Sequence, residues 1–376
     1  MLNDSDLKTT PLHTMHKELG GKLVPFAGWH MPIQFKGVME EHKCVRDGVG
    51  IFDVSHMGEI EIVGEDAESF TDFVFTNNIL NLKIGQARYG FICDFDAQVL
   101  DDVIVYKISN KRFFLCVNAG NKDSVYEWLF KLDHKFNVEI NNLSNFYGQL
   151  AVQGPKSIQE INKIFPKSNL DSLSKFYITK IVDLEEKFSS SLKVKCPNGD
   201  NFLIARTGYT GEDGYEIFAP NEVIRSVYQY LLENCNEIKP CGLASRDTLR
   251  IEAGFPLHGN ELTKGTTPID FNLNRFIDLN KPNFLGKEVI EKRLADKKYF
   301  FIGFMMDDNS IARSGYDVLK NNTKIGFVTS GTFSPVLKKG IGFALLDYKY
   351  CNIKDFEIRI RKSLKIAQKV DYPFIR

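Results

Sequence analysis

The stretch RTGYTGEDGYEI (206–217) places glycines at 208, 211 and 214 between aromatic and acidic side chains. Glycine adopts positive φ at little cost, so this segment can fold back sharply and bring its carboxylates and tyrosine rings together. The same pattern predicts a β-hairpin, with the apolar residues up to Ala205 as one strand, residues 215–218 as the next, and residues 211–214 as the turn. The two interpretations are compatible, because a hairpin arm is a rigid place on which to mount a Glu and a Tyr.

Two known binding loops do not match this stretch. A phosphate-binding P-loop requires Gly-Lys-Ser/Thr before a helix, and a calcium loop requires oxygen ligands at alternate positions followed by a distant Glu. Neither pattern is present in residues 206–217. The expected ligand is therefore a small neutral or cationic molecule, contacted by a carboxylate and an aromatic ring.

The composition is that of a folded protein of two or three domains. The chain has 376 residues, of which 43% are hydrophobic and 26% charged,. Lys plus Arg and Asp plus Glu number 48 each, so no overall positive field is available to hold nucleic acid,. Nowhere do about 18 apolar residues run together, so we expect no membrane-spanning helix.

The cysteines and histidines do not predict a metal site or a disulfide framework. Seven cysteines are scattered without any Cys-x-x-Cys spacing, and the histidines form no i, i+4 pair with an acidic third ligand,. We expect reduced, mostly buried thiols. Residues 1–10 contain neither an apolar signal-peptide core nor an Arg-rich amphipathic pattern, which favours a cytoplasmic protein.

Strand-rich and helix-rich segments alternate without a dinucleotide-binding signature, so the predicted class is α+β. Residues 91–93, 99–108 and 113–118 predict a three-stranded antiparallel meander. Regularly spaced short strands at 302–306, 324–329, 340–345 and 356–360 predict a separate all-β domain after a hinge at 281–298 that holds its own helix. Other expectations are a turn at 28–32, strands at 177–182 and 192–195, a helix at 221–235 capped by Asn221, and a helix at 248–253.

The pair Asp101-Asp102 lies inside an apolar strand, and its two side chains point to opposite faces,. Asp102 is in register with Leu100, Ile104 and Tyr106. A carboxylate in such surroundings is costly unless a cation or a hydrogen-bond donor accompanies it. The pattern leaves two possibilities open, a catalytic carboxylate or a strand-end Asp bonded to neighbouring amides.

Three further residues are candidates with a structural alternative. His56 could act as a general base, but no nucleophile elbow accompanies it, so a buried structural histidine is the favoured interpretation. The amide of Asn118 could bond a heterocycle or cap the following helix. Arg246 could form an internal ion pair with Asp247 or bind an anion, and the preceding Gly242 favours the second role.

An ordered set of motifs along nearly the whole chain resembles the aminomethyltransferase, or T-protein, of the glycine cleavage system. The matching motifs are TPL (10–12), FAGWHMP (26–32), MEEH (39–42), FDVSHMGE (52–59), LDDVIVY (100–106), VNA (117–119), VQGP (152–155), the stretch 206–217, GLASRD (242–247), RIEAG (250–254), FLGKE (284–288) and TSGTFSP (329–335). No single motif decides the match, but their order is highly specific.

The resemblance implies three domains around a central tetrahydrofolate cavity. The expected divisions are 1–52 with about 138–240, then 53–137 with about 241–285, and a barrel-like or jelly-roll-like domain at 286–376. The implied reaction moves the aminomethyl group from the lipoyl arm of H-protein to tetrahydrofolate, giving 5,10-methylenetetrahydrofolate and ammonia. It requires no metal, no nucleic acid and no membrane.

The resemblance also implies roles for single residues. Asp102 takes the catalytic role near the folate N10, and Glu216 accepts hydrogen bonds from the amino and N–H edge of the pterin. The other residues carried over as folate contacts are Tyr209, Tyr106, Met57, Asn118, Arg246 and, at the folate tail, Arg376. Glu212 and Asp213 then remain as turn residues.

Three positions depart from the family pattern. Residues 96–98 (DAQ) stand where paired glycines are common, Arg275 stands where tryptophan is usual, and Asp278 stands where a basic residue is frequent. Arg275 could meet the glutamyl carboxylates of the folate tail. Two rival functions remain: a tetrahydrofolate-dependent demethylase of a small methylated compound, and a folate-binding protein without transfer activity. The intact Asp102 and Gly-Glu-Asp-Gly hairpin argue against both.

Overall fold

The structure, a computed structural model, describes residues 6–188, 202–263 and 265–375. The chain divides into two compact units, each discontinuous in sequence. The first unit comprises Met1–Thr71, Ile79–Tyr89 and Val103–Arg246, and the second comprises Asp72–Asn78, Gly90–Asp102 and Asp247–Arg376. No helix in the described part of the chain is long and apolar enough to cross a membrane.

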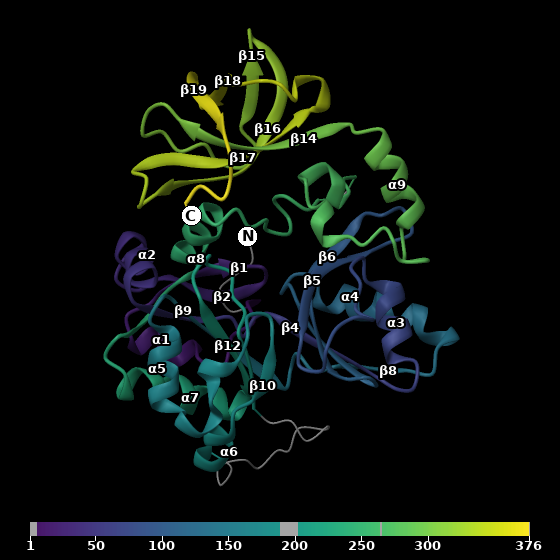
Figure 1. The fold of residues 1–376 in the computed structure, drawn as a ribbon. Helices are drawn as coiled ribbons and strands as arrows, with labels where there is room; N and C mark the ends of the chain where they lie inside the picture. The colour runs from purple at the N-terminus through teal and green to yellow at the C-terminus, as the bar shows by residue number, and fades with distance from the viewer. Residues whose placement is uncertain (1–5, 189–201, 264, 376) are drawn as a thin grey trace. The chain divides into compact units, whose positions relative to one another are not determined.

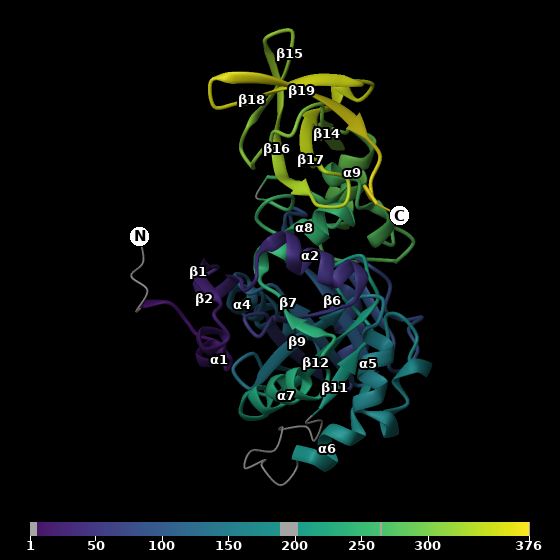
Figure 2. The same cartoon turned by 90° about the vertical axis from the view of Figure 1, so that its left-hand side faces the viewer.

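A six-stranded sheet forms the centre of the first unit, in the order β10-β11-β12-β9-β3-β13. All its neighbours pair antiparallel except β13 and β3, which run parallel. Its strands are β3 (Val49–Asp53), β9 (Tyr147–Gln153), β10 (Ile178–Lys180), β11 (Leu203–Ala205), β12 (Gly214–Pro220) and β13 (Ile238–Pro240). One face packs against α5 (Ser157–Ile164) and α7 (Asn221–Asn234), where residues such as Leu150, Ile217 and Val227 are fully buried (Figure 2).

A five-stranded sheet has the order β5-β6-β7-β4-β8. Its strands are β4 (Gly58–Val63), β5 (Ala87–Cys93), β6 (Val99–Ser109), β7 (Arg112–Val117) and β8 (Glu139–Asn142), and the β5–β6 hairpin continues from the first unit into the second. This order confirms the predicted meander. Within the first unit the two sheets share an aromatic core, in which the Phe114 ring lies 5.3 Å from that of Phe218 and 5.9 Å from that of Tyr147.

The remaining elements of the first unit are shorter. They are the hairpin β1 (Lys22–Phe26) and β2 (Trp29–Gln34), the helices α1 (His13–Glu18), α2 (Val38–Asp47), α4 (Lys122–Leu132) and α6 (Val182–Phe188), and the 3-10 turns Asp133–Lys135, Pro166–Ser168 and Leu170–Ser172. Two helices cross the boundary between the units: α3 (Ala67–Val74) and α8 (Leu243–Glu252).

A closed six-stranded barrel dominates the second unit, in the order β14-β17-β16-β15-β18-β19 (Figure 1). The strands are β14 (Tyr299–Met306), β15 (Asp317–Lys320), β16 (Thr323–Ser334), β17 (Lys339–Asp347), β18 (Asp355–Ile360) and β19 (Ser363–Val370). Closure leaves no open sheet edge, and Phe304, Val328 and Phe356 fill the interior,. The unit also holds α9 (Lys287–Ala295) and the 3-10 turns Pro268–Phe271, Asn274–Phe276 and Tyr348–Tyr350. The predicted C-terminal β strands and the helix in the hinge are thus confirmed.

Several local predictions are wrong. Residues 29–32 belong to strand β2 instead of a turn, and the two-stranded sheet has only edge strands, where Pro32 is tolerated,. Asn221 does not cap α7, because its Nδ2 donates to the carbonyl of Asn145 at 2.8 Å. The expected strand at 177–182 ends at Lys180, and α8 begins at Leu243, five residues before the expected start. The expected strand at 192–195 lies outside the described residues.

Candidate functional site

Glu216 is the central acid of the first unit. It lies on β12 between Ala205 of β11 and Ala151 of β9, and only 5% of the residue is exposed to solvent. Thr207 donates from Oγ1 to Oε2 at 2.5 Å, and Gln149 donates from Nε2 to Oε1 at 3.1 Å. A carboxylate has about four lone-pair sites. Among the described residues each oxygen of Glu216 accepts one bond, so acceptor capacity remains on both.

Burial is the main cause that raises the pKa of Glu216 above its ordinary value. The hydrogen bond from Thr207, the positive charge of Arg246 and the bond from Gln149 oppose this rise. Tyr106 lies 3.2 Å from Thr207 through the two hydroxyl oxygens. Because Thr207 donates to Glu216, its oxygen accepts from Tyr106. Burial, followed by the charge of Glu216, raises the pKa of Tyr106 well above its ordinary value.

The amide of Gln149 is oriented by a neighbour on the other sheet. Cys116 of β7 donates from Sγ to Oε1 of Gln149 at 3.6 Å, so the amide Nε2 is the end that faces Glu216. Both residues are buried. Gln149 therefore links Cys116 of the five-stranded sheet to Glu216 of the six-stranded sheet.

The loop 206–213 is longer than the predicted four-residue turn, and arginines hold it at both ends. Arg206 donates to both carboxyl oxygens of Asp213, at 3.1 and 2.7 Å. Arg46 of α2 donates from Nη1 to the carbonyl of Thr210 and to Glu212, both at 2.8 Å. The turn acids Glu212 and Asp213 thus anchor the loop to Arg46 and Arg206.

Gln153 explains two of the three glycines in this loop. Only Gly211 has positive φ, at 84°. A Cβ at Gly208 or Gly214 would lie 1.9 or 2.5 Å from the side-chain amide of Gln153. That amide donates to the carbonyl of Thr207 at 3.1 Å and accepts from Thr210 at 2.9 Å. Gly208 and Gly214 do not adopt positive φ and instead leave room for a buried amide.

Arg246 carries a buried nitrogen that has no partner among the described residues. Its guanidinium carbon lies 4.9 Å from the centre of the Tyr209 ring, and Nη1 is inaccessible to water and donates to no partner in that set. Burial lowers the pKa of Arg246, and the charge of Glu216 opposes this. The alternative ion pair with Asp247 is not seen, since Asp247 binds Arg250 at 2.8 Å. A buried unpaired donor is costly, so this nitrogen is suited to a ligand acceptor.

Met57 and His56 adjoin the same cluster. Met57 is partly exposed and packs against the aromatic core that contains Tyr106. His56 is 4% exposed, and burial lowers its pKa to about 4, with the charges of Arg246 and Lys122 acting in the same direction and that of Asp53 against it. A neutral imidazole follows at ordinary pH, as expected for a buried structural histidine.

Asn118 and Asp102 lie along neighbouring strands, Asn118 directly after β7 and Asp102 within β6. Asn118 follows β7 and is partly exposed; Asn121, not Asn118, holds the cap position of α4. Along β6, Val99, Asp101 and Val103 are buried, whereas Leu100, Asp102 and Ile104 are partly exposed. Asp102 therefore lies on the more open face. Asp102 is the last residue of the stretch Gly90–Asp102, which belongs to the second unit. Glu216, Tyr209 and Arg246 belong to the first unit. Arg376 lies outside the described residues.

Sequence reasoning missed Thr207, Gln149, Gln153 and Arg46. Gln149 and Gln153 were detectable as polar residues in an otherwise apolar strand, at an i, i+4 spacing that places both on one face,. Thr207 and Arg46 gave no signal, because their partners are fixed only by tertiary pairing.

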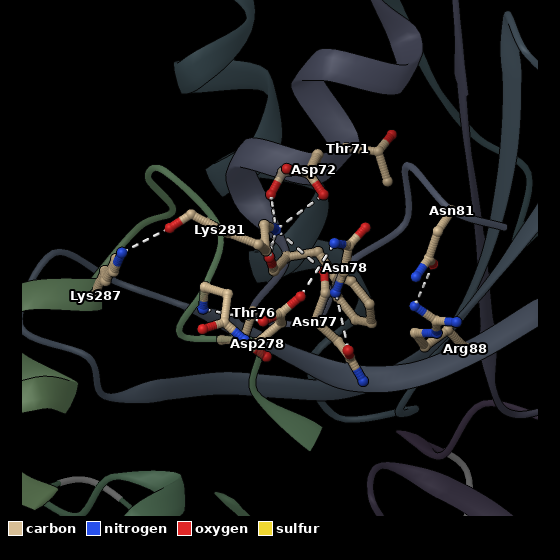
Figure 3. A network of polar contacts seen from close by, with 12 residues as sticks. Thr71, Asp72, Thr76, Asn77, Asn78, Asn81, Arg88, Asp278, Lys281 and Lys287 are labelled. Carbon is tan, nitrogen blue, oxygen red and sulfur yellow. Dashed lines mark hydrogen bonds and ion pairs between the residues drawn. The ribbon is translucent and has the colours of Figure 1, made fainter. Parts of the chain in front are cut away.

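The second unit contains a different buried network, centred on Lys281 (Figure 3). The side chain of Lys281 is 1% exposed, and its Nζ bonds the carbonyls of Asp72, Phe75 and Asn77, the last two at 2.7 and 3.1 Å. Nζ also lies 3.0 Å from Oδ1 of Asp72. Burial lowers the pKa of Lys281, and the Asp72 charge opposes this. Every donor of this ammonium is thus used.

Arg275 and Asp278, which differ from the residues usual in the family, make contacts within the second unit. Asn78 donates to Asp278 at 3.0 Å, and this bond is the main cause that lowers the pKa of Asp278. The guanidinium carbon of Arg275 lies 4.7 Å from the centre of the Phe276 ring. The contact of Arg275 with a folate tail stays a prediction.

Comparison with known proteins gives one consistent family. The family model "GCVT N-terminal domain" matches residues 12–281, and "Glycine cleavage T-protein C-terminal barrel domain" matches residues 301–375. The chain is similar to proteins named aminomethyltransferase from Thermoanaerobacter pseudethanolicus, at 43% identity over 96% of this chain and 95% of the relative, and from Alkaliphilus oremlandii, at 41% identity over 98% of both.

A solved structure agrees with this result. The glycine cleavage system aminomethyltransferase T from Bartonella henselae matches with a TM-score of 0.88 and 30% identity, over 98% of each chain. This likeness confirms the predicted α+β fold with its C-terminal barrel. The protein belongs to the aminomethyltransferase family, the T-proteins of the glycine cleavage system.

Proposed function

We propose that this protein transfers the aminomethyl group from the lipoyl arm of H-protein to tetrahydrofolate. The products are 5,10-methylenetetrahydrofolate, ammonia and the dihydrolipoyl form of H-protein. The observation that carries the proposal is the similarity over nearly the full length to proteins named aminomethyltransferase, which spans both matched family domains.

Glu216 is proposed to bind the pterin of the folate. Its two oxygens keep acceptor capacity, and a pterin offers two adjacent donors, the amino group and a ring N–H,. Two parallel charge-assisted bonds fix the rotation of a planar ring as well as its position. Thr207 and Gln149 hold the carboxylate in one orientation, so little ordering of Glu216 is required when the ligand arrives.

The remaining site residues are proposed to form the walls of the folate pocket. Arg246 would donate its unpaired Nη1 to an acceptor of the ligand, and Tyr209 stacks on that guanidinium. Tyr106, Met57 and Asn118 would contact the ring system. Arg376 is proposed for the folate tail.

Asp102 is proposed as the catalytic carboxylate. The folate N5 is already nucleophilic, and positive charge develops on the transferred carbon as it leaves sulfur. A carboxylate near that carbon stabilises the developing charge, and the partly exposed face of β6 leaves Asp102 accessible to substrate,. No metal is required for this step.

Other parts of the hypothesis concern partners and organisation. We infer that lipoylated H-protein is the protein partner and that the reaction takes place in the cytoplasm. The three-domain division, with the first two domains interleaved along residues 1–285, is part of the same proposal.

The decisive assay combines the purified protein with aminomethylated H-protein and tetrahydrofolate. Methylenetetrahydrofolate and ammonia should appear in equal amounts. Asp102→Asn should lower kcat by about a hundredfold or more while folate affinity changes by a few-fold. Asp101→Asn serves as the matched neighbour on the opposite, buried face.

Two results would contradict the proposal at different points. Folate binding without either product would remove the transfer function and favour a folate-binding protein. Product formation at normal kcat by Asp102→Asn would remove Asp102 from the mechanism while leaving the function intact. Release of a methyl-derived carbon from a small methylated compound, but not from H-protein, would identify a demethylase.

A further inference from the structure

Two cysteine thiols of the first unit lie against one another. Cys44 is on α2, and Cys241 lies between β13 and α8. Cys241 Sγ lies 3.8 Å from the carbonyl of Glu41 on the same helix α2, and each thiol is the largest influence on the pKa of the other. Cys44 Sγ also lies 3.2 Å from the carbonyl of Val49, and Cys241 Sγ lies 3.5 Å from that of Lys239. Val49 is on β3 and Lys239 is on β13, and these two strands pair with each other. The two carbonyls that contact the thiols therefore come from adjacent strands.

The packing around the pair is close. A Cβ at Gly50 would lie 2.8 Å from the sulfur of Cys241, so glycine at this position makes room for the thiol. Cys241 is 2% exposed, whereas Cys44 is partly exposed. The two cysteines therefore differ in exposure, and Cys44 is the one that reaches the surface in part.

The two thiols differ in their acidity. The neighbouring thiol of Cys241 is the main cause that lowers the pKa of the Cys44 thiol. The Cys44 thiol, followed by burial, raises the pKa of Cys241 well above its ordinary value. The thiolate is the reactive form of cysteine, so the more exposed member of the pair is also the more nucleophilic one.

We propose that Cys44 and Cys241 are an oxidation site, which hydrogen peroxide converts into a reversible disulfide. The Cys44 thiolate attacks one peroxide oxygen, the O–O bond breaks, and the other oxygen leaves as water after taking up a proton. Cys44 is then a sulfenic acid. The sulfur of Cys241 attacks it and expels the second oxygen as water, with the thiol proton. Two thiols are oxidised and one peroxide is reduced to two waters.

The location gives the disulfide a consequence for the candidate site. Cys44 is two residues before Arg46, which anchors the loop that carries Tyr209. Cys241 precedes Gly242, whose N–H donates to Oε2 of Glu41 at 2.8 Å at the start of α8, the helix that carries Arg246. The disulfide would thus join the two elements that present the stacked Tyr209 and Arg246. This consequence depends on the proposed function, but bond formation does not.

The test is peptide mapping of the full chain after brief treatment with hydrogen peroxide, with remaining thiols alkylated. We expect an intact mass lower by two hydrogen atoms, one peptide pair linking Cys44 to Cys241, and full reversal by dithiothreitol. Cys44→Ser and Cys241→Ser should each abolish the linked pair. Cys351→Ser, which removes a partly exposed thiol of the second unit, should leave it unchanged.

Two outcomes overturn the proposal. One is irreversible oxidation of Cys44 in the wild type with Cys241 still free for alkylation after unfolding. The other is a link from Cys44 to any other cysteine. Circular dichroism of Cys44→Ser and of Cys44→Ala confirms that the variants fold, so that loss of the link reports on the thiol. Folate affinity of the oxidised wild type is measured separately, and a change there tests the consequence for Tyr209 and Arg246.

Discussion

Arg246 and Lys281 both place a cationic nitrogen in the interior, yet their surroundings are opposite. The Lys281 ammonium bonds three carbonyls and a carboxylate within the second unit. The Arg246 guanidinium, in the first unit, stacks on Tyr209 and leaves Nη1 without a partner among the described residues. A polar group that is completely satisfied stabilises the fold, whereas one that is left unsatisfied costs free energy unless a ligand pairs with it.

The comparison of Lys281 with Arg246 distinguishes a charged residue that stabilises the fold from one that is suited to bind a ligand. Lys281 ties residues 72–77 to residue 281 and has no donor left for a substrate. Arg246 shares its neighbourhood with Glu216, which also keeps bonding capacity. We therefore expect substitutions at Lys281 to affect stability, and substitutions at Arg246 and Glu216 to affect ligand affinity.

The largest effect is expected for Lys281→Met. This change leaves the Asp72 carboxylate buried beside three carbonyls without their donor, and should lower the free energy of unfolding by about 3–5 kcal/mol. Urea unfolding followed by circular dichroism measures it. Lys365→Met is the control, because Lys365 pairs with Asp308 at 2.8 Å on the exposed surface and should cost less than about 1 kcal/mol,. Equal losses in both variants would remove the distinction.

The second effect concerns pH and His56, whose pKa is lowered chiefly by burial. His56 has an ordinary pKa of 6.5 that is lowered to about 4 in the folded protein. Below pH 6.5 the unfolded chain takes up a proton that the folded chain does not. The stabilisation is therefore complete above pH 6.5 and is lost as pH falls toward 4, by about 3 kcal/mol in total.

His56→Gln isolates this contribution. The difference in unfolding free energy between wild type and variant should change by this amount between pH 7 and pH 4. His134→Gln, at an exposed position, should show no such change. A difference that is constant with pH would show that His56 protonates equally in both states.

Arg246→Met should separate affinity from stability. Because Nη1 forms no bond within the described protein, its loss should change the free energy of unfolding by less than about 1 kcal/mol, or raise it. Tetrahydrofolate affinity should fall by about ten- to a hundredfold, measured by titration calorimetry. Arg225→Met, which removes a surface arginine bonded to the carbonyl of Pro11 at 3.3 Å, should leave affinity unchanged. Lost stability with normal affinity would reverse the assignment of Arg246.

The smallest effect is expected for Glu216→Gln. The amide keeps the shape and one acceptor but presents an N–H₂ group where the pterin needs an acceptor, so affinity should fall by about tenfold. Equilibrium titration against wild type measures the change. Glu212→Gln is the matched control, since Glu212 only anchors the loop through Arg46. An affinity loss as large in the control would place the effect in loop geometry.

Periodicity and turn chemistry predicted much of the fold. The meander, the barrel strands and the helix in the hinge followed from alternation and helix-stop signals. Strand β2 was mistaken for a turn because Gly28 and Pro32 are both turn formers, and only its pairing with β1 reveals the strand. Strand β3 was missed because a short central strand with a glycine has no distinct period.

The site was less accessible to sequence reasoning. The resemblance supplied Glu216, Tyr106 and Arg246, but the residues that hold them became visible only in three dimensions. Cys116 orients Gln149, and Gln149 orients Glu216, across 33 and 67 residues of chain. The polar pattern of β9 marks the two glutamines, but it does not reveal which residues they bind. The same holds for Gln153, which fixes the identity of two glycines that looked like simple turn residues.

The Lys281 network also constrains how the protein is made. Asp72 emerges from the ribosome 209 residues before its partner lysine. At a synthesis rate of about 5–20 residues per second, the segment waits roughly 10–40 s for its ammonium. During that interval three backbone carbonyls and a carboxylate destined for the interior have only water to bind. The second unit can therefore be completed only late in synthesis, after Lys281 has joined its early segments.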